Sequence, residues 1–291
     1  MARKEVTLAL PTDLVEQLES LAHAQCQTFE EQVVAELRRS VSRLSGISCD
    51  RLARDQSSEL HLTSPIIGLV EGLLTGETTI GEVLCKGDFG IGTLNHLDGE
   101  VVILDGVAYQ QGWQGRCRLV DDAEKTPFMT VTRWQPGRAV TVPLSARMDR
   151  AQLLAELERH FPSPNLFYAI RLTGRFESLR ARSVKKQKVD RPLVAVAKDQ
   201  AVFELGAGSG TLVGFWSPPF MGSALTVPGF HLHFLSEDKM QGGHLLEAVL
   251  LEGEAQIQAL HHTDTDLPKT QTFLGADLTR DPAEDLESAE K

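Results

Sequence analysis

Three histidines near residue 240 have the spacing of a metal site. His231 and His233 are two apart in an apolar run, and His244 follows the polar segment 236–243. In a strand, side chains two apart lie on one face, so the first two imidazoles project together. The segment 236–243 ends in two glycines, which suits a hairpin that returns the chain and brings His244 beside them. Three imidazoles with an open coordination position are a common plan for catalytic zinc, although a His-x-His pair on a metal-free sheet has the same spacing.

Other residues with suitable chemistry give weaker signals. Arg180 and Arg182 could clamp a carboxylate, and exposed arginines at a sheet edge would show the same pattern. The glycine-studded segment 87–100 contains Gly-x-Gly, but it lacks the strand–loop–helix order of a phosphate-binding loop. His261 and His262 are adjacent and would point opposite ways in a strand, so we expect them at the surface.

Short strands must position these side chains. The predicted strands are Glu100–Leu104, Thr130–Trp134, Phe167–Leu172, Thr211–Phe215, Phe230–Leu235 and Leu245–Leu251. Helical spacing is present from Ser64 to Leu74 and over 149–161, and Thr79 followed by Glu82 predicts a capped helix start. Strands dominate and helices are few. We therefore expect an α+β fold with a β-rich body of mixed sheets in two subdomains.

A small strand-helix-helix module precedes this body. Residues 4–10 alternate like a strand, and helices are predicted to begin at Thr12 and Thr28. One strand and two short helices cannot bury their apolar faces alone. We therefore expect the unit to pair with a second copy. Its order and lengths resemble a ribbon-helix-helix module, whose usual work is DNA binding. The chain is thus divided into a dimerisation module at 1–46, a linker at 47–60 and a catalytic domain at 61–291.

The composition of the chain limits the kinds of partner that it can bind. The net charge of −11 opposes general nucleic-acid binding, and the first 46 residues carry five basic against seven acidic side chains. We therefore expect a homo-oligomer formed through the module, with DNA binding as the alternative. The four cysteines form no Cys-x-x-Cys pair, which argues against a disulfide framework. No apolar run approaches the roughly 18 residues of a membrane helix, and a cytoplasmic protein without a membrane partner is expected.

The segments taken together resemble the alpha-acetolactate decarboxylase family, from about Leu62 to near the C-terminus. The segments that carry the resemblance are Thr79-Ile-Gly-Glu-Val-Leu, Gly87-Asp-Phe-Gly-Ile-Gly-Thr-Leu-Asn-His-Leu-Asp-Gly-Glu100, Leu104-Asp-Gly-Val-Ala-Tyr-Gln, Lys125-Thr-Pro-Phe, Phe167-Tyr-Ala-Ile-Arg-Leu-Thr-Gly-Arg-Phe, Arg180-Ala-Arg-Ser, Val227-Pro-Gly-Phe-His-Leu-His-Phe-Leu-Ser-Glu-Asp-Lys and Gly-Gly-His244. Many matches in the same order make a specific signal. The N-terminal module is a departure, because the family enzyme normally has no such unit.

The resemblance implies a set of site residues. It implies that His231, His233 and His244 hold Zn2+, that Glu100 lies at the metal and that Thr93 lines the substrate pocket.

It also implies a catalytic arginine and a glutamate from the C-terminal tail. Arg182 matches the arginine, and the Leu-Glu-Ser match selects Glu287 for the tail position. Glu284 and Glu290 are close to that position, and the spacing departs from the family's by a few residues.

The activity implied is zinc-dependent decarboxylation of 2-acetolactate to acetoin and CO2. In such a reaction the metal acts as a Lewis acid, Arg182 holds the departing carboxylate, and Glu100 with the tail glutamate manages protons. A regulator that senses acetolactate and binds DNA through the N-terminal module is the alternative from another class. A zinc-stabilised structural protein is a third reading, although structural zinc sites are normally closed by four ligands.

Overall fold

The computed structural model describes residues 12–24, 29, 33 and 58–290. The chain divides into two compact units, Met1–Asp55 and Gln56–Lys291. In the first unit, α1 (Thr12–Ala24) begins at the predicted residue, and Leu18 on it is buried. The strand predicted at 4–10 lies outside the described residues, as does most of the second predicted helix. The ribbon-helix-helix assignment therefore stays a prediction.

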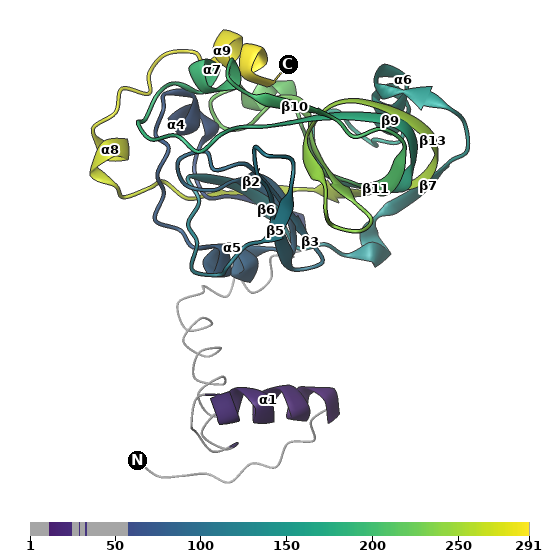
Figure 1. Cartoon of the computed structure of the whole chain (residues 1–291), viewed down its shortest axis with the longest axis horizontal. Helices are drawn as coiled ribbons and strands as arrows, with labels where there is room; N and C mark the ends of the chain where they lie inside the picture. Colours follow the sequence, from purple (N-terminus) through teal and green to yellow (C-terminus); the bar gives the residue numbers. More distant parts are fainter. Residues whose placement is uncertain (1–11, 25–28, 30–32, 34–57, 291) are drawn as a thin grey trace. The chain divides into compact units, whose positions relative to one another are not determined.

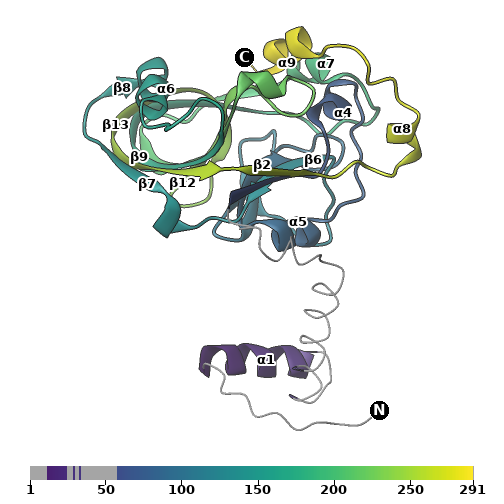
Figure 2. The same cartoon turned by 180° about the vertical axis from the view of Figure 1, so that it is seen from behind.

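The second unit contains two seven-stranded sheets (Figures 1 and 2). The first sheet has the order β14-β1-β6-β2-β3-β4-β5. Its strands are β1 (Glu59–Leu62), β2 (Phe89–Thr93), β3 (Glu100–Leu104), β4 (Val107–Gln111), β5 (Cys117–Leu119), β6 (Phe128–Thr132) and β14 (His262–Thr265). Strand β14 runs parallel to β1 and the other pairs are antiparallel, so the sheet is mixed as predicted. Strand β1 starts inside the range 47–60 that the sequence predicts as linker.

The second sheet curls on itself. Its strands are β7 (Val140–Leu144), β8 (Met148–Asp149), β9 (Phe167–Ser183), β10 (Ala201–Glu204), β11 (Gly208–Ser217), β12 (Gly229–Ser236) and β13 (Gly242–Leu260). The order is β10-β9-β11-β12-β13-β7, and β8 pairs with β13. An additional pairing of β9 with β13 closes β9, β11, β12 and β13 into a ring, which is seen end-on in Figure 1.

Short helices cover the sheets. They are α4 (Ile66–Val70), α5 (Ile80–Lys86), α6 (Arg150–Glu158), α7 (Leu193–Ala197), α8 (Gln271–Leu274) and α9 (Ala283–Glu290), with 3-10 turns at Pro136–Arg138 and Pro219–Met221. The predicted capping box is present at α5, where the Thr79 hydroxyl accepts from the Glu82 N–H and the Glu82 side chain accepts from the Thr79 N–H. Helix α4 is shorter than the predicted 64–74, because Pro65 precedes it and Gly72 follows with φ of +85°. None of the described helices is long and apolar enough to cross a bilayer.

Two large apolar cores fix which face of β12 meets the first sheet. One core lies between the sheets and includes Phe89 of β2, Val102 of β3 and Phe215 of β11. The other core contains side chains from the opposite face of the second sheet and from α6, and it includes Leu232 and Phe234 of β12. These two side chains point into a core, as the alternation of β12 predicts. His231 and His233, which alternate with them along β12, therefore face the first sheet.

Candidate metal centre

The histidine triad, defined as His231, His233 and His244, is assembled by one hairpin. On β12 the first two side chains share a face, and the hairpin pairs His233 directly with His244 of β13. One ligand atom of each histidine lies within 4.8 Å of those of the other two. The ring centroids are 5.1–5.4 Å apart. The structure thus brings together the three imidazoles that the spacing suggested.

A buried arginine lies beside the triad. Arg182 of β9 is directly opposite His244 in the β9–β13 pair, and only 4% of it is exposed. Arg180 lies on the far side of a β-bulge in β13, is 41% exposed, and forms an ion pair with Glu247 at 3.1 Å. The residue pattern alone gave Arg180 and Arg182 the same candidate role, but the structure gives them different environments. Arg182 is at the site, and Arg180 is at the surface.

The first sheet contributes a glutamate. Glu100 begins β3, and its Oε2 lies 3.7 Å from His233 Nε2. The neighbouring carbonyl of Val101 accepts a hydrogen bond from His233 Nδ1 at 3.0 Å. Thr93 pairs with Glu100 across β2 and β3, and its hydroxyl donates to the Gly99 carbonyl at 2.6 Å. Thr93 therefore lies beside Glu100 and stabilises the turn that leads into it.

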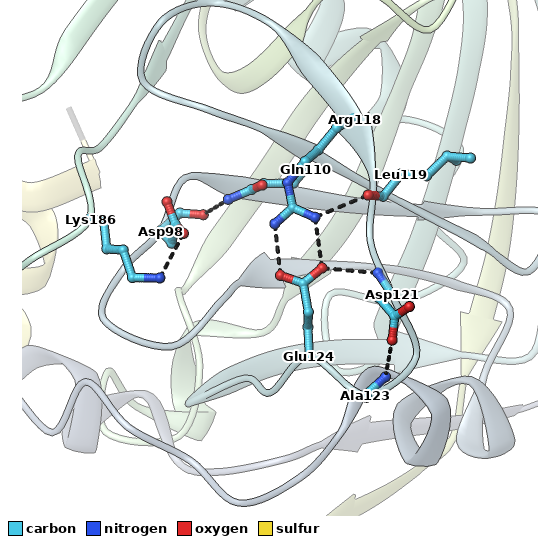
Figure 3. A network of polar contacts seen from close by, with 8 residues as sticks. All are labelled: Asp98, Gln110, Arg118, Leu119, Asp121, Ala123, Glu124 and Lys186. Carbon is cyan, nitrogen blue, oxygen red and sulfur yellow. Dashed lines mark hydrogen bonds and ion pairs between the residues drawn. The ribbon is translucent and has the colours of Figure 1, made fainter.

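That turn is tied to the strand that carries the arginine. Lys186, which follows β9, forms an ion pair with Asp98 at 3.1 Å, and the Gln110 side chain donates to the Asp98 carbonyl (Figure 3). Next to this contact, both outer nitrogens of Arg118 donate to Glu124 at 2.7 Å. Of these contacts, the Lys186–Asp98 pair links the first sheet to the segment after β9, and the others lie within the region of the first sheet.

The C-terminal helix α9 supplies a second carboxylate. Glu290 Oε2 is 3.5 Å from His244 Nε2 and 3.7 Å from His231 Nε2, and its Oε1 is 3.9 Å from Arg182 Nη2. The helix is anchored by Leu286, which is 1% exposed.

The structure places Glu290 at the site in the position that the sequence gave to Glu287, which is exposed. In a helix, residues four apart share a face, so Glu290 lies on the same face as buried Leu286. Glu287 is turned about 100° away from Leu286 around the helix axis. Buried Ala289 lies on the same inner side. The apolar spacing of Leu286 and Ala289 was the signal that could have identified Glu290.

Burial sets the protonation of the triad. Desolvation, with a contribution from the positive charge of Arg182, lowers the pKa of His231 to about 3. Desolvation also holds the pKa values of His233 and His244 well below the ordinary value. The three imidazoles are therefore neutral at physiological pH, which is the form that binds metal ions.

The two carboxyl groups are shifted in the opposite direction. Burial raises the pKa of Glu100 to about 7, opposed by the positive charge of Arg182. Burial also raises the pKa of Glu290, again opposed by Arg182. A carboxyl group with a pKa near 7, such as that of Glu100, can both accept and donate protons near neutral pH.

The residues present fit a divalent metal ion. His233 Nε2 is buried and has no hydrogen-bond partner among the described residues, while its Nδ1 is bonded to a backbone carbonyl. A second ring nitrogen held in this way is the usual support of a metal-binding imidazole. Leaving a buried polar atom unpaired costs about 1–3 kcal/mol, and coordination would remove that cost. The triad is therefore consistent with a bound metal.

Comparison with known proteins gives one consistent result. The family model described as "Alpha-acetolactate decarboxylase" matches residues 60–280. The alpha-acetolactate decarboxylase of Brevibacillus brevis is 39% identical over 228 residues, covering 78% of this chain and 79% of that protein. The enzyme of Methylococcus capsulatus is 38% identical, covering 81% and 90%. The crystal structure of alpha-acetolactate decarboxylase from Bacillus subtilis strain 168 superposes with a TM-score of 0.77 at 34% identity, covering 80% of this chain and 99% of that one.

The fold, the assembled site and the sequence match therefore agree over the same part of the chain. The match extends over most of the second unit, including the triad, Arg182 and Glu100, and ends before Glu290. This chain belongs to the alpha-acetolactate decarboxylase family of carboxy-lyases.

Proposed function

We propose that the protein is a zinc-dependent decarboxylase that converts 2-acetolactate to acetoin and CO2. The observation that carries the proposal is the buried triad of neutral imidazoles with one guanidinium and two carboxyl groups around it. Three nitrogen ligands with an open position are the donor set of catalytic zinc. The relatives' names support the substrate, since they are called alpha-acetolactate decarboxylases.

The assignment of roles follows from charge and position. His231, His233 and His244 would hold the zinc, and because they are neutral they leave the ion its double charge. When bound, the metal supplies Lewis acidity to the hydroxyl and ketone oxygens of the substrate, where negative charge collects as CO2 leaves. The Arg182 guanidinium binds the substrate carboxylate and fixes the bond that breaks.

The two carboxyl groups handle protons. Loss of CO2 leaves an electron pair that moves toward the ketone oxygen, and the former carboxyl-bearing carbon must then receive a proton. Glu100, whose pKa burial raises to about 7, can take the hydroxyl proton and return it to the same oxygen in the product. Glu290 also faces the triad and would deliver a proton to the carbon. Our proposal thus gives Glu290 the tail role first assigned to Glu287.

A matched pair of substitutions tests the tail assignment. Glu290→Gln keeps the shape of the side chain and removes its proton transfer, so kcat is expected to fall about 10²- to 10⁴-fold. Glu287→Gln makes the same chemical change on the exposed side of α9 and should leave kcat within about twofold. Steady-state acetoin release measures both. A larger loss in Glu287→Gln would contradict the role of Glu290.

The activity itself is tested by turnover. The purified full-length chain, given racemic 2-acetolactate, should release acetoin and CO2 in equal amounts above a protein-free control. A chelator should remove this activity, and added zinc should restore it. Metal-loaded protein that forms no acetoin would overturn the proposed function, and full activity after complete metal removal would overturn the metal dependence.

We also infer that residues 1–46 make the chain a homo-oligomer in the cytoplasm. The net charge of −2 over this segment disfavours contact with phosphates and therefore DNA binding. Sedimentation of the full chain at micromolar concentration should show at least a dimer, and a monomer throughout would contradict the inference.

A further inference from the structure

A row of side chains on the first sheet extends the site beyond Glu100. Gln111 of β4 pairs directly with Glu100 of β3, and Cys117 of β5 pairs directly with Gln111. Directly paired residues of antiparallel strands point to the same face, and neighbouring strands are about 4.8 Å apart. Gln111 therefore lies on the face that Glu100 turns toward His233.

The amide of Gln111 has a defined orientation. Its Oε1 accepts a hydrogen bond from the Cys117 thiol at 2.7 Å. Burial raises the pKa of that thiol to about 12, so the sulfur keeps its proton and is able to donate. With the thiol as donor, the amide oxygen is its partner. The Gln111 Nε2 is thus the end of the amide that the thiol leaves unused.

The side-chain oxygen and the backbone carbonyl of Gln111 both accept hydrogen bonds, whereas its side-chain nitrogen has no hydrogen-bond partner among the described residues. Its backbone carbonyl accepts from the Ser183 hydroxyl at 2.8 Å, one residue beyond Arg182, and the whole residue is only 3% exposed. The Nε2 is buried without a hydrogen-bond partner among the described residues. Arg182 Nε and His233 Nε2 share this property. Three of the seven such side-chain atoms among the described residues thus belong to residues around one site, where a ligand could supply the missing partners.

We propose that Gln111 is a substrate-binding residue whose Nε2 donates a hydrogen bond to the substrate carboxylate, beside Arg182. The inference rests on the proposed function. Of the substrate's oxygens, the hydroxyl and the ketone face the metal in that proposal, and the two carboxylate oxygens remain for protein donors. A carboxylate only accepts hydrogen bonds, so an amide N–H and a guanidinium are a suitable pair of donors for it.

The test compares a ligand that has the carboxylate with one that lacks it. Gln111→Met keeps the length of the side chain and removes the donor. The KM for 2-acetolactate should rise about tenfold to a hundredfold, as for loss of a hydrogen bond to a charged group, with kcat within about threefold. Acetoin has no carboxylate, so its inhibition constant should stay within about twofold of the wild-type value. Metal content should also match the wild type.

Other outcomes overturn the inference. An unchanged KM would mean that the amide does not bind substrate. An equal rise in the acetoin inhibition constant would indicate general damage to the pocket, and a fall in kcat with an altered pH profile would show that the amide serves Glu100 instead. Should Gln111→Met fail to fold, Gln111→Asn retains an amide that is one carbon too short and should show the same KM rise. A wild-type chain without turnover would refute the proposed function, whereas active wild type with unaffected variants would refute only the role of Gln111.

Cys117 offers a matched control. Cys117→Ser retains a donor to the Gln111 Oε1 and should keep KM near the wild-type value. A KM as high as that of Gln111→Met, with a normal melting temperature, would contradict the orientation argued for the amide.

Discussion

Replacing His233 by alanine is expected to abolish metal retention and turnover together. His233 is 1% exposed, and its Nε2 has no hydrogen-bond partner among the described residues. Loss of a residue that merely supports a ligand costs about 10- to 100-fold in affinity or activity, so loss of a ligand should cost more, on the order of 10³-fold. Metal per chain in desalted protein and acetoin release from the same sample are the two readouts.

His262→Ala is the control for this experiment. It removes the same imidazole from an exposed position on β14, outside the triad, and should leave both readouts unchanged. If His233→Ala kept its metal and normal turnover, the triad could not be the metal site.

Replacing Arg182 by lysine is expected to lower kcat/KM about 10²- to 10³-fold while metal binding is retained. The guanidinium presents several N–H donors in a rigid plane, and a lysine ammonium cannot reproduce that geometry at a carboxylate. Lysine keeps the positive charge that opposes the raised pKa values of Glu100 and Glu290, so the loss should come from geometry, with little change in the pH profile.

Arg180→Lys makes the same change two residues away. Arg180 is 41% exposed and pairs with Glu247 and Glu204, so kcat/KM should stay within about twofold. Equal losses in the two variants would show that the burial of Arg182 has no bearing on catalysis.

Local pattern was enough to predict the parts of the site that lie on one hairpin. The alternation around residue 232 predicted a strand with its histidines on one face, and the polar segment 236–243 predicted a hairpin that brings His244 beside them. The turn itself lies before Gly242, because Gly242 and Gly243 already pair with β12 as the first residues of β13. The strand predicted at Glu100–Leu104 is β3 itself. The capping box predicted at Thr79 likewise depends on side chains three residues apart. In each case the determining contacts are close in sequence.

Contacts between distant segments could not be predicted in this way. Strand β9 runs for 17 residues, but only Phe167–Leu172 was predicted, because exposed Thr173, Arg175 and Glu177 interrupt its apolar pattern. Its pairing with β13, which puts Arg182 opposite His244, contains three register shifts that no local motif indicates.

The carboxylates show the same limit. Glu100 reaches His233 across 133 positions of the sequence, and a family resemblance, not spacing, pointed to it. In the tail, the match to the family's glutamate was uncertain by a few residues, so the resemblance selected Glu287 and not Glu290. Each residue of a helix turns the side chain by about 100°, so a shift of this size changes which glutamate faces the site. The strand predicted at Thr130–Trp134 is likewise shifted by two residues from β6.

The most direct test of the metal centre is anomalous diffraction at the zinc absorption edge, from crystals of the full-length chain grown with zinc. We expect one peak per chain, about 2.0–2.1 Å from a ring nitrogen of each of His231, His233 and His244. Imidazoles that point to separate places, or a triad that stays empty in zinc-soaked crystals, would contradict the account.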